Sequence, residues 1–130
     1  MMVLDASAAI ELLLRTSSGR RVQARIFSPS ESLHAPHLID LEVAQALRRS
    51  VASGTITSAR GEQALEDLRD LSLERYAHEI LLERIWQLRH NLTAYDAAYV
   101  ALAERLAAPV LTCDRKIASP GRHRARVELI

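Results

Sequence analysis

Four acidic residues stand where the ends of strands and the starts of helices are expected. Asp5 directly follows the apolar run MVL, and Asp114 comes two residues after the end of the run VLT. Glu42 and Asp96 each fall in the first turns of an expected helix. In a parallel sheet, the carboxyl ends of the strands and the starts of the helices that follow them share one edge. The four side chains can therefore converge there.

Carboxylates gathered in this way repel one another, by about 3 kcal/mol for two charges roughly 5 Å apart at an effective dielectric near 20. Hard divalent cations relieve that repulsion, and magnesium takes oxygen ligands while keeping several waters. Two such ions about 4 Å apart can activate water and stabilise the leaving oxygen of a phosphodiester. The pattern predicts a Mg²⁺ or Mn²⁺ site for phosphodiester hydrolysis.

Each acid also has an ordinary structural interpretation. Asp5 is suited to a turn or helix cap, and Asp96 to a capping box with the preceding threonine. Glu42 alone is typical of a solvated helix surface, and Asp114 has a possible ion-pair partner in Arg115. The joint pattern, rather than any one residue, favours the metal site.

Composition and length indicate one globular domain over residues 1–130. Hydrophobic residues make up 48% and charged residues 25%, which argues against disorder. No apolar run approaches the roughly 18 residues that span a bilayer, and two acids interrupt the starting segment MMVLDASAAIELLL. We therefore expect a cytoplasmic protein without a membrane segment. The formal charge of +1 gives no global attraction to nucleic acid, and the single Cys113 excludes an internal disulfide.

Short apolar segments alternate with longer helical patterns. Strands are expected at 3–4, 33–35, 73–76, 110–112 and 127–130. Helices are expected from near Ser7 until TSSG (16–19) breaks the first one, within 20–27, at 38–49, after Thr57, at 79–89 and from Thr93 to Leu106, where Pro109 stops the last. This order predicts an α/β sandwich around a mostly parallel sheet.

Three segments and their order resemble the PIN-domain ribonuclease family, specifically its VapC-type toxin members from bacterial toxin–antitoxin pairs. They are MVLDASAAI, APHLIDLEVAQALRR and LTAYDAAYVALAERLAAPVLTCD, and with the short basic tail the resemblance covers nearly the whole chain. It implies a PIN-like three-layer sandwich with helices flanking the sheet.

The resemblance also implies roles for particular residues. By position, Asp5, Glu42, Asp96 and Asp114 match the family's four acidic positions, and Ser7 and Thr112 match its small hydroxyl residues. We expect Asp5 and Asp96 to hold the principal metal, with Asp114 and Glu42 completing the site or a second ion. Ser7 and Thr112 are expected to orient carboxylates by hydrogen bonds.

The implied activity is metal-dependent endonucleolytic hydrolysis of RNA that leaves a 5′-phosphate and a 3′-hydroxyl. The implied partners are the RNA substrate, a second copy of the chain in a homodimer, and a small VapB-type antitoxin that inserts a segment near the acidic cleft.

Basic residues flank the acidic positions in the sequence. They are either phosphate contacts or solvated surface, and the candidates for RNA contact are Arg15, Arg20, Arg115, Lys116 and Arg122. The aromatic residues Trp86, Tyr95 and Tyr99 are expected in the core or in an interface rather than as stacking platforms for RNA bases.

Three alternative functions fit parts of the pattern. The first is a PIN-like RNA- or protein-binding module that does not cut. The second, a haloacid-dehalogenase-type phosphatase, needs a second Asp two residues after the first, where this chain has Ser7. The third, a phosphoreceiver domain, needs an acidic pair at the first strand and a central strand-end Asp, and neither is evident.

Overall fold

The computed structural model describes residues 1–118 and 123–130. Within them the strands form one five-stranded sheet in the order β3-β2-β1-β4-β5. The strands are β1 (Met2–Leu4), β2 (Leu33–Pro36), β3 (Leu73–Tyr76), β4 (Val110–Thr112) and β5 (Val127–Leu129). Every neighbouring pair is parallel, and Val3 in the central strand pairs with both His34 and Val110. The expected strands and their parallel arrangement are confirmed.

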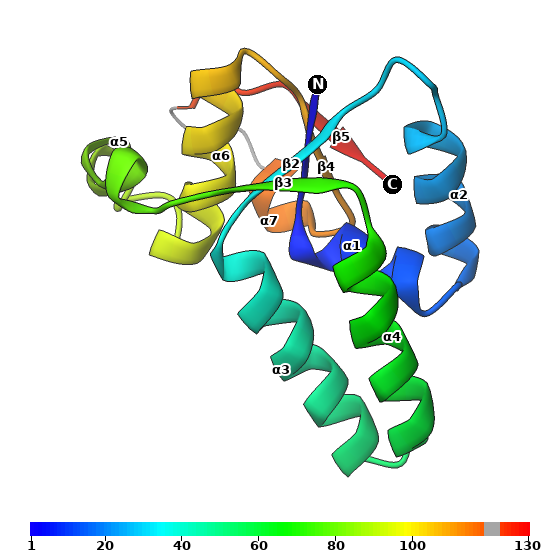
Figure 1. Cartoon of the computed structure of the whole chain (residues 1–130). Helices are drawn as coiled ribbons and strands as arrows, with labels where there is room; N and C mark the ends of the chain where they lie inside the picture. Colours follow the sequence, from blue (N-terminus) through cyan, green and yellow to red (C-terminus); the bar gives the residue numbers. More distant parts are fainter. Residues whose placement is uncertain (119–122) are drawn as a thin grey trace.

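Helices cover both faces of the sheet (Figure 1). The helices are α1 (Ala6–Leu13), α2 (Ser17–Ile26), α3 (Leu38–Ala52), α4 (Ser58–Asp70), the 3-10 turn η1 (Glu79–Leu81), α5 (Leu82–Gln87), α6 (Ala94–Leu106) and α7 (Arg115–Ala118). Figure 1 places α1 to α4 on one side of the sheet and α5 and α6 on the other. This is the expected three-layer sandwich.

Several helix boundaries follow from local chemistry. Thr57 and Thr93 cap α4 and α6, each accepting a hydrogen bond from the backbone N–H three residues ahead. α6 ends at Leu106, as predicted, and Ala107 then adopts the left-handed conformation at φ 50°. The predicted helix at 79–89 is divided into η1 and α5.

The prediction for the TSSG segment was wrong. α1 already ends at Leu13, and Arg15 turns the chain with φ 56°. Thr16 then caps α2, so TSSG starts a helix instead of breaking one. A Cβ on Gly19 would lie 1.9 Å from the carbonyl oxygen of Glu11, so this glycine allows α1 and α2 to pack closely. The one-turn helix α7 was not predicted, because four residues carry no helical periodicity.

The chain reverses its direction across the sheet between β1 and β4. It builds β1, β2 and β3 toward one edge, then returns through α5 and α6 to place β4 on the other side of β1. Open parallel sheets bind ligands at the carboxyl ends of the strands where such a reversal occurs. The topology therefore directs attention to the ends of β1 and β4. In the described part of the chain, no helix combines the length and apolarity needed to cross a membrane.

Candidate active site

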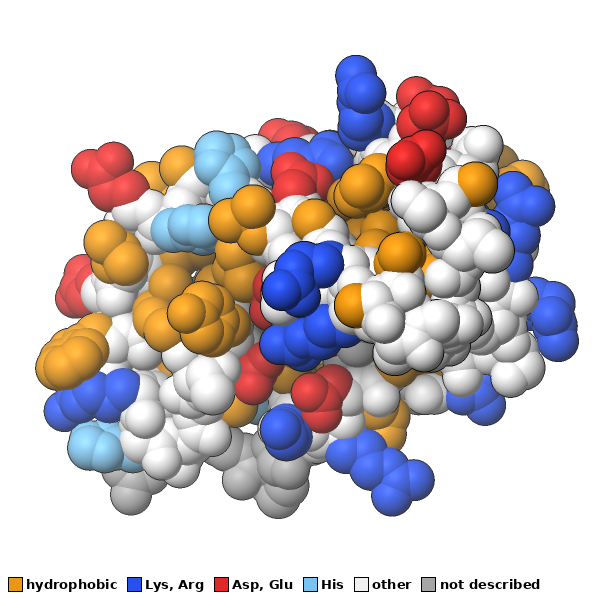
Figure 2. All heavy atoms as spheres, turned by 90° about the horizontal axis from the view of Figure 1, so that it is seen from below, with side chains coloured by type: hydrophobic (Ala, Val, Ile, Leu, Met, Phe, Trp, Pro, Cys, Tyr) orange, Lys and Arg blue, Asp and Glu red, His pale blue; other side chains and the backbone are white. Residues whose placement is uncertain are grey.

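A cleft of about 420 Å³ opens at the carboxyl ends of β1 and β4, and it brings together the four acids singled out in the sequence. Asp5 follows β1, Glu42 lies on α3, Asp96 in the first turn of α6, and Asp114 just beyond β4. Figure 2 views this edge of the molecule, with acidic side chains in a hollow between basic and hydrophobic ones. Residues up to 109 positions apart in the sequence thus share one cleft.

Asp5 is the most buried of the four, at 5% exposure. Its Oδ2 atom accepts hydrogen bonds from Ser7 Oγ at 2.5 Å, from Thr112 Oγ1 at 2.8 Å and from the Ser7 N–H at 3.3 Å. Each hydroxyl has one proton to donate and gives it to Asp5, and each also accepts a backbone N–H: Ser7 from Cys113 and Thr112 from Asp114, both at 2.9 Å. This network fixes the carboxylate and joins the end of β4 to the start of α1.

Glu42 is half-buried and accepts a hydrogen bond of 2.5 Å from the hydroxyl of Tyr99. Tyr99 lies on α6 and is fully buried, so it holds the carboxylate from within the core. Sequence analysis expected Tyr99 in the core or in an interface, and it lies in the core, but its bond to Glu42 was not predicted.

The carboxylates in the cleft have too little positive charge near them to balance their own negative charge. Burial raises the pKa of Asp5, the hydrogen bonds from Ser7 and Thr112 oppose the shift, and the charge of Asp96 adds to it. Burial likewise raises the pKa of Glu42, Tyr99 opposes it, and Asp5 and Asp96 raise it further.

Asp96 follows the same pattern. Burial raises its pKa, Thr93 lowers it, Asp114 raises it and Lys116 lowers it. Three carboxyl groups in one cleft are thus shifted toward protonation, and their neighbours contribute to each shift. Adding a cation there would reverse those shifts.

The donor set fits a hard divalent cation, because it consists of carboxylate oxygens with hydroxyls behind them. Among residues 1–118 and 123–130, however, no three acidic, histidine or cysteine side chains are grouped closely enough to form a ready metal cage. Hydrogen bonds to Tyr99, Ser7 and Thr112 hold the carboxylates of Glu42 and Asp5 in place. Mg²⁺ suits such an open arrangement, since it usually keeps several of its waters.

The predicted RNA-contacting residues do not line this cleft. Arg15 lies in the turn between α1 and α2, 4.0 Å from Asp67, and Arg20 lies within α2. Lys116 lies closer, because its backbone N–H donates to Asp114 and its charge lowers the pKa of Asp96. Arg115 is exposed on α7, and Arg122 lies outside the described residues. RNA contact by these residues stays a prediction.

Among the residues that line the cleft, sequence reasoning missed Arg49 and Tyr95 as candidates for substrate contact. Arg49 lies on α3, and Tyr95 is 65% exposed beside Asp96. Tyr95 was expected in the core or an interface, as was Trp86, and both are exposed. The heptad spacing between Glu42 and Arg49 was the available signal, since residues seven apart share a helix face.

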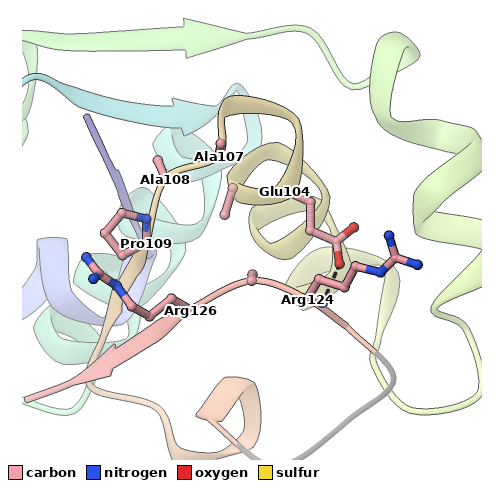
Figure 3. A pocket seen from close by; sticks show the side chains of 8 residues that line it. Glu104, Ala107, Ala108, Pro109, Arg124 and Arg126 are labelled. Carbon is pink, nitrogen blue, oxygen red and sulfur yellow. Dashed lines mark hydrogen bonds between the residues drawn. The ribbon is translucent and has the colours of Figure 1, made fainter.

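A larger hollow of about 600 Å³ lies at the amino end of β4, on the opposite edge of the sheet (Figure 3). Its walls carry Arg124 and Arg126 and one carboxylate, Glu104. Glu104 is already bound by Arg84 at 2.6 Å and by the Arg124 N–H at 2.8 Å. The bond from Arg84 lowers the pKa of Glu104 below its usual range. This carboxylate is neutralised, so the acidic chemistry belongs to the smaller cleft.

A family model described as PIN domain matches residues 2–122. The chain belongs to the PIN-domain family. Like this PIN domain, its relatives are short chains: ribonuclease VapC9 of Mycobacterium tuberculosis (strain H37Rv) is 41% identical over 130 residues, which is 100% of this chain and 98% of that protein. Ribonuclease VapC12 of the same strain is 40% identical over 130 residues, covering 100% and 99%. Ribonuclease VapC1 is 45% identical over 121 residues, covering 92% and 90%. The predicted VapC-type membership is confirmed.

Two solved structures share the PIN-domain fold. PAE2754 from Pyrobaculum aerophilum has a TM-score of 0.70 and 22% identity, and the match covers 97% of this chain and 81% of that chain. VapBC2 from Rickettsia felis, bound to a DNA fragment from its promoter, has a TM-score of 0.70 and 11% identity, with coverage of 98% and 97%. At these identities the likeness establishes the fold alone.

Proposed function

We propose that this PIN domain is a Mg²⁺- or Mn²⁺-dependent endoribonuclease and the toxin of a VapBC-type toxin–antitoxin pair. The observation that carries the proposal is the convergence of Asp5, Glu42, Asp96 and Asp114 in one cleft. The raised pKa values of Asp5, Glu42 and Asp96 there call for a cation. The ribonuclease names of relatives that align over the whole chain support the choice of RNA as substrate.

The four acids divide the work in this proposal. Asp5 and Asp96 hold the principal ion, and Asp114 and Glu42 complete the site. A bound divalent cation would supply an activated water as nucleophile and stabilise the leaving oxygen of the phosphodiester. No side chain of the protein then needs to act as nucleophile, which agrees with the role of Ser7 as a hydrogen-bond donor to Asp5.

The remaining polar residues act by positioning the acids. Ser7 and Thr112 hold one oxygen of Asp5, so that the carboxylate keeps a single orientation. Tyr99 does the same for Glu42 from beneath. Preorganised carboxylates avoid the cost of ordering long side chains each time substrate binds.

Three further parts of the proposal concern partners and place of action. A VapB-type antitoxin would inhibit this chain by covering the acidic cleft, and the VapBC2 complex from Rickettsia felis supports such a pairing by its shared fold. We propose a homodimer on the strength of the family, and light scattering of the purified chain tests it. An RNA substrate implies action in the cytoplasm.

Incubation of purified protein with total RNA, followed by mapping of the cut ends, tests the activity. We expect cleavage with Mg²⁺ or Mn²⁺, loss of cleavage in EDTA, and 5′-phosphate ends. Asp96→Asn should lower the rate at least 100-fold, whereas Asp70→Asn, an exposed residue at the end of α4, should not change it. Equal cleavage by the parent and by Asp96→Asn would refute the assignment. Manganese binding by the parent with no cleavage of any RNA would instead favour the silent binding module.

A further inference from the structure

The acidic cleft continues along one face of α3. Glu42, Gln45 and Arg49 all line it, at spacings of three and four residues that place them on the same side of the helix. Glu42 and Arg49 are seven residues apart, and at 1.5 Å per residue this is about 10 Å along the helix axis. Arg49 is therefore too far along α3 to contact the same phosphate as the four acids.

Arg49 is the single cation among the described residues that line the cleft. It is exposed and forms no ion pair or hydrogen bond with a side chain of the described residues, unlike Arg75, which is bound to Asp40, or Arg84, which is bound to Glu104. An unpaired guanidinium presents a planar set of donors that matches the oxygens of a phosphate.

The other walls of the cleft include apolar side chains, two of which are well exposed. Leu41 is 75% exposed and Tyr95 is 65% exposed, and both line the cleft together with Ile10 and Leu38. Aromatic and apolar side chains beside a basic group are typical of sites that accept an unpaired base, because a base in a duplex has no free face to stack.

We propose that Arg49 binds a backbone phosphate of an unpaired RNA strand, one or two nucleotides from the phosphate at the four acids, with the intervening base against Tyr95. The inference rests on the proposed function, and it names a residue that positions the substrate. A strand lying along α3 would pass from the acids over Gln45 to Arg49, so its path across the cleft is defined by one phosphate contact at each end.

The chain supplies a matched control in Arg48. It precedes Arg49 on the same helix and is also exposed, but it lines a separate groove between α3 and α4 with Gly61 and Leu65. Arg49→Ala and Arg48→Ala remove the same charge from adjacent positions. A difference in RNA binding between the two variants therefore reflects a contact in the cleft, and not a change in the net charge of the protein.

The test is equilibrium binding of a fluorescent 12-nucleotide unstructured RNA, measured by anisotropy in an Asp96→Asn background to limit cutting. We expect Arg49→Ala to raise Kd about tenfold, as for one lost charge-assisted hydrogen bond, and to reduce the slope of log Kd against log salt by about 0.7. Arg48→Ala should change neither. Melting temperatures of both variants check that each is folded.

A scan with neutral methylphosphonates then locates the contact. When one phosphate at a time is replaced, one replacement should weaken binding to the Asp96→Asn single variant but not to the double variant that also carries Arg49→Ala. Mapping of the cut made by the parent protein should place that phosphate one or two nucleotides from the scissile bond. Equal effects of Arg49→Ala and Arg48→Ala, or no phosphate that couples to Arg49, would overturn the inference. A parent that cuts no RNA refutes the proposed function separately, because the binding comparison needs no cleavage.

Discussion

Asp96→Asn should make the metal-free protein more stable at neutral pH, although it removes a proposed metal ligand. Asn keeps the size of the side chain. The hydroxyl of Thr93 caps the helix by accepting a hydrogen bond from the backbone N–H of residue 96, so the substitution leaves this bond in place. What changes is the charge: Asp96 raises the pKa of Asp5 and Glu42, and Asp114 raises that of Asp96.

The size of the gain follows from these three repulsive pairs. Two carboxylates about 7 Å apart at an effective dielectric of 20 repel by about 2 kcal/mol. Solvent and salt screen groups that are half-exposed, which reduces the combined repulsion to about 2–3 kcal/mol. Losing the favourable charge at the start of α6 and the attraction to Lys116 subtracts about 1 kcal/mol. We expect a net gain of about 1–2 kcal/mol, or about 3–8 °C in Tm for a domain of this size.

The gain should depend on pH with a definite sign. A carboxyl whose pKa is raised in the folded state binds more protons there than in the unfolded chain, so stability falls as pH rises from its ordinary value of 3.8 through the folded value. The parent suffers this loss and the variant does not, so the difference in Tm should be small at pH 3.5 and full at pH 7.

Thermal unfolding followed by circular dichroism in EDTA provides the measurement, with and without added Mg²⁺. Glu66→Gln is the control, since Glu66 is exposed on α4 away from the cleft, and its Tm should match the parent. Mg²⁺ should stabilise the parent more than Asp96→Asn. If Asp96→Asn melts at or below the parent in EDTA at pH 7, the four carboxylates are not in electrostatic conflict and the argument for a cation fails.

Two further predictions concern single contacts. Tyr99→Phe removes a hydrogen bond that lowers the pKa of Glu42, so a carbon-13 NMR titration should show that pKa rising further, and an unchanged value would mean that the bond is absent in solution. Gly19→Ala should destabilise the fold by about 3 kcal/mol in urea denaturation, because its Cβ would overlap the carbonyl of Glu11. Gly61→Ala is the control: its Cβ meets side-chain methyl groups, of Val51 at 3.1 Å and of Ile56 at 3.9 Å, and no backbone atom, so a similar loss at both glycines would contradict the packing argument.

The sequence by itself determined the strands, most helices and the edge at which the acids lie. These are local properties: an apolar run ends at Asp5, a threonine caps the helix that carries Asp96, and parallel strands bring such ends to one edge. The predicted helix boundaries were wrong where the local sequence signal was ambiguous. Thr16 is equally suited to ending one helix and capping the next, and packing against Gly19 decided between them.

Only the tertiary structure decided how the acids are held and which basic group joins them. The bond between Thr112 and Asp5 spans 107 positions and that between Tyr99 and Glu42 spans 57, so no local pattern encodes either. Arg48 and Arg49 look alike in the sequence, but adjacent helix residues point about 100° apart. The burial of Val43 and Leu47 sets the rotation of α3, and that rotation turns Arg49, not Arg48, toward the acids.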